Sequence, residues 1–384
     1  MRCIALVPFV VCVLMVLASQ GFANDLLLNL GPEEFVKASG IDIDIGDYSV
    51  PSFVDWNNDG LEDLIIGTGS GKVRVYLNVG TESNPQFLNY FYAQSNGSDL
   101  YCPPAGCLGC FPRVVYWDAD ARKDLLVGQG NGTIKIFLNI GTDETPTFDG
   151  GTLLKVGQPG LKVDIDVGDR ATPYVVDWNN DGKKDLVVGA LDSKIHIFIN
   201  EGTDTAPDFL VKVFAQLAGP PPSDLVVPGQ RSSPVVLDLD GDGKKDLLTG
   251  NTNGQLLFYS NVGTDDAPLF SNYLLVESNG VPIGISGSPR TRPFVCDWTG
   301  DGYLDVLIGV YDGKVHLYQS IPQVGDLDKD YDVDFIDFAL FANYWQQTGC
   351  GKCGGADLAG NDGYVGNDDL QQLVENWLAD ILAP

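Results

Sequence analysis

The fold of this chain is decided by a nine-residue acidic stretch that reads Asp55-Trp56-Asn57-Asn58-Asp59-Gly60-Leu61-Glu62-Asp63. Side chains that carry oxygen stand at alternate positions, a glycine allows the backbone to turn sharply, and a carboxylate closes the stretch. A calcium ion needs this arrangement, because a shell of carboxylate, amide and backbone oxygens holds it. The stretch therefore predicts a calcium-binding loop.

The stretch is one copy of a repeat. Three further complete copies and one damaged copy occur, at 177–185, 238–246, 297–305 and 116–124 respectively. The closing aspartates lie 61, 61, 61 and 59 residues apart, so the motif marks a unit that occurs five times. Acidic turns without metal are the alternative, since Asp and Asn favour turns. Intact spacing in four copies favours calcium and predicts a repeat architecture.

Each unit contains the pattern of four short β-strands. A Pro-x-φ-φ segment such as 51–54 precedes the loop, and a β-branched run ending in glycine, such as 185–189, follows it. An alternating run such as 72–77 comes next, and then Asn-x-Gly-Thr and Pro-x-Phe, as in 78–87. Such runs between Gly, Asn and Asp turns are typical of an antiparallel meander. Four strands without helical periodicity predict one blade of a β-propeller.

The ends of the repeat region predict how the ring closes. The fifth unit stops after Gln319 and lacks its fourth strand. The N-terminal segment 35–47 matches 154–169, which ends the second unit and leads into the third. An N-terminal strand at about 35–48 is therefore expected to complete the last blade and to remove an open sheet edge. A β-solenoid is the alternative, but it does not explain the displaced strand.

The acidic loop followed by Leu-Val-Val-Gly resembles the FG-GAP/VCBS repeat, the calcium-loop blade of integrin-type propellers, over roughly residues 35–320. The resemblance implies an all-β, five-bladed propeller that occupies 24–322. It also implies that the side chains at positions one, three, five and nine of each complete loop bind Ca²⁺. These are Asp55, Asn57, Asp59 and Asp63; Asp177, Asn179, Asp181 and Asp185; Asp238, Asp240, Asp242 and Asp246; and Asp297, Thr299, Asp301 and Asp305.

The second unit departs from the pattern. Tyr116 replaces the first ligand and Ala121 replaces the glycine. The acids that are left, Asp118, Asp120 and Asp124, are expected to bind calcium weakly or not at all.

A different module is expected at 323–384. Oxygens at Asp326, Asp328, Asp330, Asp334 and Asp337 have the spacing of an EF-hand loop. Tyr331 stands where a glycine is expected, which costs backbone strain. A second loop at 357–369 is one residue too long, and apolar residues at helical spacing follow each loop.

The two loop-helix units resemble a type I dockerin, a helical calcium-binding module that attaches secreted proteins to cohesin-bearing scaffolds. The resemblance implies a cohesin-like or cell-surface partner for 323–384. Cys350 and Cys353 are separated by two residues and are candidates for a disulfide in an oxidising compartment. The pairing of Cys102, Cys107 and Cys110 stays open.

Composition and the first residues predict the compartment. Met1-Arg2, an apolar run over 3–18 and small residues at 21 and 23 indicate a signal peptide at 1–23, with an N-terminal membrane anchor as the alternative. No other stretch is long and apolar enough for a transmembrane segment. The protein is therefore expected outside the cytoplasm, extracellular or periplasmic. A net charge of −29 argues against nucleic acid as a partner.

Aromatic residues recur at one position of the unit: Trp56, Trp117, Trp178 and Trp298 occupy it, and Leu239 fills it in the fourth unit. A lectin would expose such rings to sugars, whereas packing between blades is the alternative. A position that also accepts leucine favours packing.

The sequence does not indicate catalysis. Its two histidines, His196 and His316, occupy a strand position that holds Arg, Lys or Leu in other units. This predicts a generic, partly solvated face and not a general base. A two-carboxylate glycosidase stays open, although the repeated acids already have a calcium role.

The sequence thus predicts a secreted, non-catalytic, calcium-binding propeller that acts as a binding or scaffold module and is tethered through its tail. A glycan or a protein is the expected ligand of the propeller. The alternative is a role in extracellular polysaccharide degradation, as a lectin-like propeller or as a polysaccharide-active enzyme docked on a scaffold. The segments 89–111 and 216–231 are the least repetitive, so ligand specificity is expected there.

Overall fold

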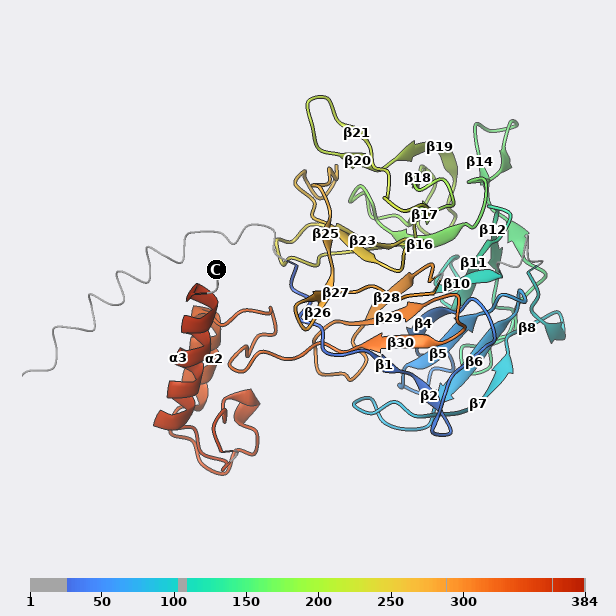
Figure 1. The fold of residues 1–384 in the computed structure, drawn as a ribbon. Helices are drawn as coiled ribbons and strands as arrows, with labels where there is room; N and C mark the ends of the chain where they lie inside the picture. Colours follow the sequence, from blue (N-terminus) through green and yellow to red (C-terminus); the bar gives the residue numbers. More distant parts are fainter. Residues whose placement is uncertain (1–25, 103–108, 288, 361, 383–384) are drawn as a thin grey trace, which may run out of the picture.

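The computed structural model describes residues 26–102, 109–287, 289–360 and 362–382 (Figure 1). The expected signal peptide at 1–23 and Cys107 lie outside these residues. Within them, no helix is long and apolar enough to cross a membrane. Cys350 and Cys353 form the expected disulfide, while Cys102, Cys110 and Cys296 form no disulfide with another described residue.

Five antiparallel sheets follow one another along the chain, as the repeat predicts. The first blade contains β4 (Val50–Val54), β5 (Asp63–Gly67), β6 (Val73–Asn78) and β7 (Phe87–Tyr92). The second contains β10 (Cys110–Val115), β11 (Asp124–Gln129), β12 (Ile134–Phe137) and β13 (Thr152–Leu153). The third contains β16 (Thr172–Val176), β17 (Asp185–Gly189), β18 (Ile195–Asn200) and β19 (Phe209–Phe214). The fourth contains β22 (Pro234–Leu237), β23 (Asp246–Gly250), β24 (Leu256–Tyr259) and β25 (Leu274–Leu275), and the fifth contains β28 (Arg292–Cys296), β29 (Asp305–Gly309), β30 (Val315–Tyr318) and β1 (Glu34–Phe35).

The first strands of the blades form the inner wall of a closed ring. The strands β4, β10, β16, β22 and β28 contact one another in this order, and β28 contacts β4. Such a cyclic set of contacts defines a five-bladed propeller, and it excludes the β-solenoid.

The glycine that ends the second strand of each blade allows neighbouring blades to approach closely. A Cβ atom on Gly67 would lie 2.2 Å from the carbonyl oxygen of Cys110, in the first strand of the next blade. The equivalent glycines of the other blades meet the next blade in the same way, at 2.0 to 2.4 Å. Since any side chain would clash with this backbone, the glycine of the repeat is a requirement of ring packing.

The N-terminal strand closes the ring, but it is shorter than expected. The strand β1 pairs with β30 through Glu34 with Leu317 and Phe35 with His316. The rest of the expected strand at 35–48 was predicted wrongly, because Ser39 and Gly40 adopt left-handed φ angles that reverse the chain. It forms the hairpin of β2 (Lys37–Ala38) and β3 (Ile41–Asp42), which contacts Phe87 of the first blade.

Similar hairpins occur at the other junctions between blades. They are β8 (Gln94–Ser95) with β9 (Ser98–Asp99), β14 (Lys155–Val156) with β15 (Val163–Asp164), β20 (Gln216–Leu217) with β21 (Ser223–Asp224) and β26 (Glu277–Ser278) with β27 (Val281–Pro282). Three of them form a parallel bridge to the Phe of the Pro-x-Phe motif, or its equivalent, in the following blade: Ser95 to Phe148, Val156 to Phe209 and Leu217 to Phe270. Each hairpin therefore braces one blade against its neighbour.

The recurrent tryptophan packs between blades, which confirms the expectation of a structural role. All four tryptophans are buried, and each ring meets a Phe of the following blade, as Trp178 meets Phe270 at 6.0 Å between centroids. In the fourth blade Leu239 lies instead in a cluster with Leu28 and Leu30. Because the fifth unit lacks the Pro-x-Phe motif, these N-terminal leucines fill the missing place. The rings are thus not available for stacking on sugars.

The tail contains α2 (Phe335–Tyr344), the short 3₁₀ turn η1 (Cys353–Gly355) and α3 (Asn367–Leu382), which lie apart from the blades in Figure 1. The helix α2 begins at the N-cap Asp334, whose side chain accepts from the N–H of Ile336, and Asp337 completes a capping box. Phe341, Leu373 and Val365 are among the buried residues of a separate apolar cluster.

Candidate calcium loops

The closing aspartate of the loop is a buried structural acid in every blade. Asp185 accepts the N–H of Trp178 at 2.9 Å through Oδ2 and the N–H of Asn200 at 2.7 Å through Oδ1. Equivalent pairs of bonds reach Asp63, Asp124, Asp246 and Asp305, and all five carboxylates are at most 2% exposed. The acid ties the start of the loop to the end of the third strand, even in the damaged second unit. The sequence predicted it only as a ligand.

Burial makes the negative charge of this acid costly. It raises the pKa of Asp63, Asp185 and Asp305 to about 6 and that of Asp246 to about 7. The two backbone N–H groups lower the pKa, whereas neighbouring loop carboxylates raise it. Each site is therefore short of positive charge.

The first acid of each complete loop preforms the turn. Oδ2 of Asp177 accepts the N–H of Gly182 at 2.8 Å, and Oδ1 accepts that of Asp181 at 3.0 Å. Gly182 has a φ of +80°, which a side chain would make unfavourable. The same bond from the glycine reaches Asp55, Asp238 and Asp297.

The fourth blade brings its acids closest together. Asp238, Asp240 and Asp246 offer oxygens that lie within 4.8 Å of one another. The acids of the other three complete loops do not converge this closely among the described residues. There the amide of Asn57 donates to Asp59 at 2.9 Å, and that of Asn179 donates to Asp181 at 3.4 Å. Thr299 fills the same position in the fifth loop.

In three units a basic side chain pairs with the acid at the fifth loop position and so competes with a metal ion for it. Lys183 pairs with Asp181 at 3.1 Å, and Lys244 pairs with Asp242 at 2.5 Å. In the second unit, Arg122 binds Asp120 and also donates to the carbonyl of Gly141 at 3.0 Å. The equivalent residues of the first and fifth loops are Leu61 and Tyr303, which carry no charge.

The first tail loop also gathers acids. Asp326, Asp328, Asp330 and Asp337 offer oxygens within 4.8 Å of one another. Burial and the neighbouring carboxylates raise the pKa of Asp328 to about 6. Asp337 accepts the N–H groups of Leu327 and Asp328, whereas Asp334 is the N-cap of α2. Asp334 also offers an oxygen within 4.8 Å of those of Asp332 and Asp337.

The second tail loop repeats this pattern in spite of its extra residue. Asp357 accepts the N–H of Gly363 at 2.8 Å, and Asp369 accepts those of Ala359 and Gly366, both at 2.8 Å. Asn361 lies outside the described residues.

Tyr331 has a role that the sequence did not reveal. Its φ is +73°, as expected for a residue at a glycine position. Its ring packs edge-on against Tyr303 of the fifth blade loop at 5.2 Å, and its hydroxyl accepts the N–H of Leu304. Tyr303 in turn donates its hydroxyl to the carbonyl of Asp326 at 3.2 Å, and Lys329 donates to the carbonyl of Asp301. The first tail loop therefore docks on the fifth blade loop.

Both histidines are buried, so the expectation of a partly solvated face was wrong for them, although Arg74 and Lys135 at the same position are partly exposed. Phe214 covers His196 and Phe35 covers His316, each at 5.0 Å between rings. Burial lowers the pKa of His196. His196 contacts the carboxylate of Asp192 at 3.1 Å, and this pair lies apart from the loops.

A family profile of the FG-GAP-like repeat matches residues 177–249 and 238–308. A comparison with curated proteins gave no significant match. Among solved structures, the Tc holotoxin pore of Photorhabdus luminescens aligns with a TM-score of 0.37 and 17% identity, over 70% of this chain and 11% of that chain. BBS1N, solved in complex with ARL6DN, aligns with a TM-score of 0.38 and 13% identity, over 78% of this chain and 98% of that chain. The repeat match and the ring of sheets agree: the chain contains FG-GAP-like repeats arranged as a five-bladed β-propeller.

Proposed function

We propose that this protein is a calcium-stabilised propeller that acts as a non-catalytic binding or scaffold module outside the cytoplasm. The observation that carries the proposal is the convergence of Asp238, Asp240 and Asp246 within 4.8 Å, in a loop whose backbone is already turned. Clustered carboxylate oxygens are the ligands that Ca²⁺ prefers, and backbone carbonyls or water complete its shell. The tail loop with Asp326, Asp328, Asp330 and Asp337 supports the same ion at a second place.

Calcium supplies what these loops lack, which is positive charge beside buried carboxylates. The acids are supplied by the start of the loop and by the second strand, while the bonds of the closing acid reach the third strand. An ion bound there stabilises the blade by holding these parts together. The aspartates then stabilise the fold, and the ligand of the module is expected to bind elsewhere on the propeller.

The test is the effect of calcium on thermal unfolding of the full chain. We expect millimolar Ca²⁺ to raise the Tm well above its value in EGTA, with Mg²⁺ much less effective. Asp240→Asn should reduce the number of bound ions measured by calorimetry. Asp118→Asn, in the damaged second loop, is the matched control and should leave it unchanged. Equal melting in Ca²⁺ and EGTA would overturn the proposal.

The tail is proposed as the tether. Ile336 and Phe338 of α2 and Val374 of α3 are apolar and exposed on the outside of the helices, which suits a partner surface. We expect the full chain to bind an immobilised type I cohesin in Ca²⁺ and to dissociate in EGTA. Ile336→Asp should abolish binding, whereas Ile41→Asp on the hairpin β2–β3 should not. Absence of binding in both buffers would reject the tether and leave the calcium proposal intact.

A further inference from the structure

One position of the repeat, three residues before the proline of each first strand, adopts a left-handed backbone in every blade. The residues there are Tyr48, Gly109, Arg170, Arg231 and Arg290, with φ angles of 40°, 68°, 62°, 62° and 52°. Such a backbone conformation is strained for any residue that carries a side chain. Three consecutive blades nonetheless place arginine there, where the chain enters the inner wall of the ring.

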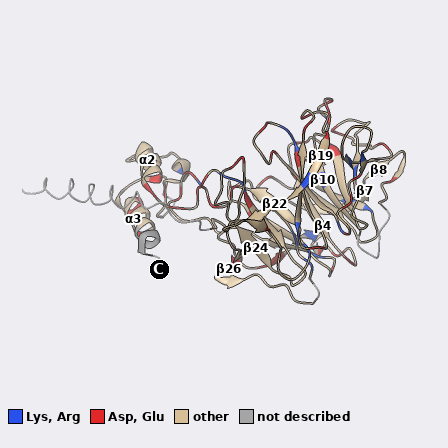
Figure 2. Ribbon diagram, turned by 90° about the horizontal axis from the view of Figure 1, so that it is seen from above, with Lys and Arg blue, Asp and Glu red and all other residues tan. Residues whose placement is uncertain are grey.

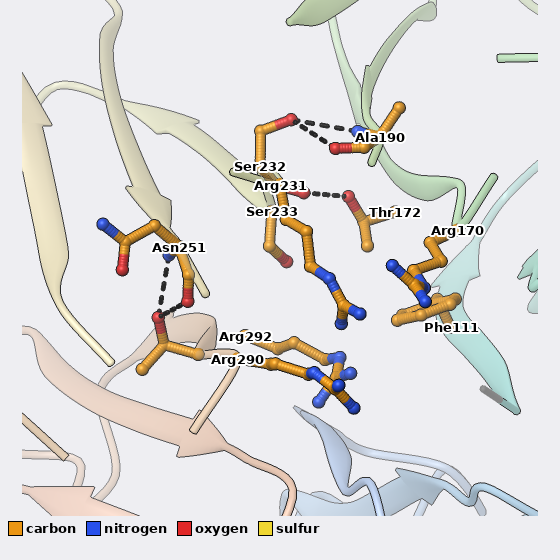
Figure 3. Close-up of a pocket in the computed structure, with 11 residues that line it drawn as sticks. Phe111, Arg170, Thr172, Ala190, Arg231, Ser232, Ser233, Asn251, Arg290 and Arg292 are labelled. Atoms are coloured by element: carbon orange, nitrogen blue, oxygen red, sulfur yellow. Dashed lines mark hydrogen bonds between the residues drawn. The ribbon is translucent and has the colours of Figure 1, made fainter. Parts of the chain in front are cut away.

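These three arginines converge with a fourth. Arg170, Arg231 and Arg290 point toward a common centre together with Arg292 of β28, as Figure 3 shows. They line a cavity of about 20 Å³ between the third, fourth and fifth blades. Ser233 and Asn251 add polar atoms to its wall.

Among the residues that the structure describes, the cluster has no acidic partner. The cavity wall contains no Asp or Glu, although the chain has 52 acidic and 23 basic residues, whose acids mark many of the loops in Figure 2. Within the described part of the chain, none of the four arginines forms an ion pair with a carboxylate. The acid beside Arg170 in sequence, Asp169, is exposed and raises the pKa of Arg170, while burial, the larger effect, lowers it.

Two nitrogens of the cluster have no acceptor among the described residues. The Nε atoms of Arg170 and Arg290 are buried without a hydrogen-bond partner. Arg292 is 4% exposed and has one long contact, at 3.5 Å, to the carbonyl of Ser49. The rings of Tyr48 and Phe111 support its guanidinium at 5.2 and 5.4 Å. Buried donors on charged groups are stabilised by an acceptor, so this place suits an anionic group.

The like charges also oppose one another. Burial, followed by repulsion from Arg231, Arg290 and Arg170, lowers the pKa of Arg292 to about 9. Burial and repulsion from Arg170 lower that of Arg231 to about 10. An anion at the centre would relieve both effects.

We propose that this arginine cluster is a binding site for a tetrahedral oxyanion, sulfate or phosphate, either free or as the terminal group of a larger molecule. Guanidinium groups present forked donors that match such oxygens in pairs. Four of them, arriving from three blades, can serve more acceptor oxygens than a carboxylate offers. The cavity as it stands has room for about one water molecule, so the half-exposed Arg170, Arg231 and Arg290 must move outward to admit the larger anion.

Calorimetry of the full chain with sodium sulfate tests the site, at constant ionic strength set with chloride. We expect saturable binding of sulfate and a rise in Tm that chloride does not produce. Arg231→Gln and Arg170→Gln should each weaken sulfate binding by about tenfold or more. Arg74→Gln, on β6 and outside the cavity, is the matched control and should bind as the wild type does. Circular dichroism checks that both cavity variants fold. If one of them does not fold, the other alone tests the site.

The outcomes separate the sources of the anion. Displacement of sulfate by 4-nitrophenyl sulfate supports a site for terminal sulfate groups, and binding of free sulfate alone supports an inorganic anion site. Acetate binding without sulfate binding overturns the tetrahedral assignment. No saturable anion binding, or equal binding by Arg231→Gln and the wild type, overturns the proposal. None of these results depends on calcium, so the proposed function is tested separately.

Discussion

The closing aspartate acts at the scale of a single residue, because its two oxygens hold two separate pieces of backbone. Asp124 makes both bonds in a unit that lacks the first ligand and the glycine. An asparagine there would offer one acceptor and one amide donor, and the donor would face a backbone N–H.

Asp124→Asn is therefore expected to destabilise the protein by about 2 kcal/mol, even in EGTA. The measurement is the urea midpoint of unfolding in EGTA. Asp118→Asn, at a partly exposed acid of the same loop, is the control and should change the urea midpoint little. A midpoint for Asp124→Asn equal to that of the wild type would show that the buried bonds contribute nothing.

The lysine at the seventh loop position competes with calcium for the acid at the fifth position. Lys183→Leu copies the first blade and removes the pair with Asp181. We expect calcium to bind the third loop a few times more tightly, since exposed ion pairs are worth up to about 1 kcal/mol. Calorimetric titration measures this, with Lys194→Leu, which pairs with Asp224 away from the loop, as the control. Unchanged affinity would mean that the pair does not compete with the metal.

At the scale of elements, the strand that closes the ring depends on a few N-terminal side chains. Leu30 is 1% exposed and bridges Ser320 of the fifth unit and Ser278 of the last hairpin. The adjacent hairpin β2–β3 carries Ile41 in solvent. The two aliphatic residues thus differ chiefly in burial.

Leu30→Ala is expected to destabilise the propeller by about 2–5 kcal/mol, because it leaves a cavity between the fourth and fifth blades. Ile41→Ala, its matched control, should stay within about 0.5 kcal/mol of the wild type. Thermal and urea unfolding measure both. Similar losses in the two variants would contradict a specific role of the N-terminal segment in closure.

The sequence predicted those elements whose pattern recurs in several units of the repeat. Five prolines, five closing acids and the glycine at the end of each second strand predict the strands, their order and the closure of the ring. The hairpins between blades were missed because strands of two residues have no readable periodicity. The arginine cluster was missed because its members are equivalent only after alignment, and left-handed φ angles at Arg170, Arg231 and Arg290 have no signal in side-chain type.

At the scale of the whole molecule, the tail and the propeller meet through Tyr331. A glycine there would relieve the left-handed backbone but would remove the contacts with Tyr303 and Leu304. Strain in the tail loop is thus linked to docking on the fifth blade.

Tyr331→Gly is expected to release the tail from the propeller and to tighten calcium binding in the tail loop. Small-angle scattering should show a larger radius of gyration, and trypsin should cut the chain faster at Lys329. Tyr331→Phe keeps the ring contact, so its radius of gyration and its rate of cleavage should lie between those of the wild type and of Tyr331→Gly. A compact, protease-resistant Tyr331→Gly protein would show that other contacts hold the tail.

The pairing that closes the ring, between β1 and β30, has a mechanical consequence. The strand β30 is held on one side by four residue pairs with β29 and on the other by two pairs with β1, and the chain runs from β30 into the tail. A protein attached through its tail would pass any pulling force into this blade first. The pairing of β1 with β30 would then open before the other blades do. Tension applied from outside would therefore detach the N-terminal strand while the repeats stay folded.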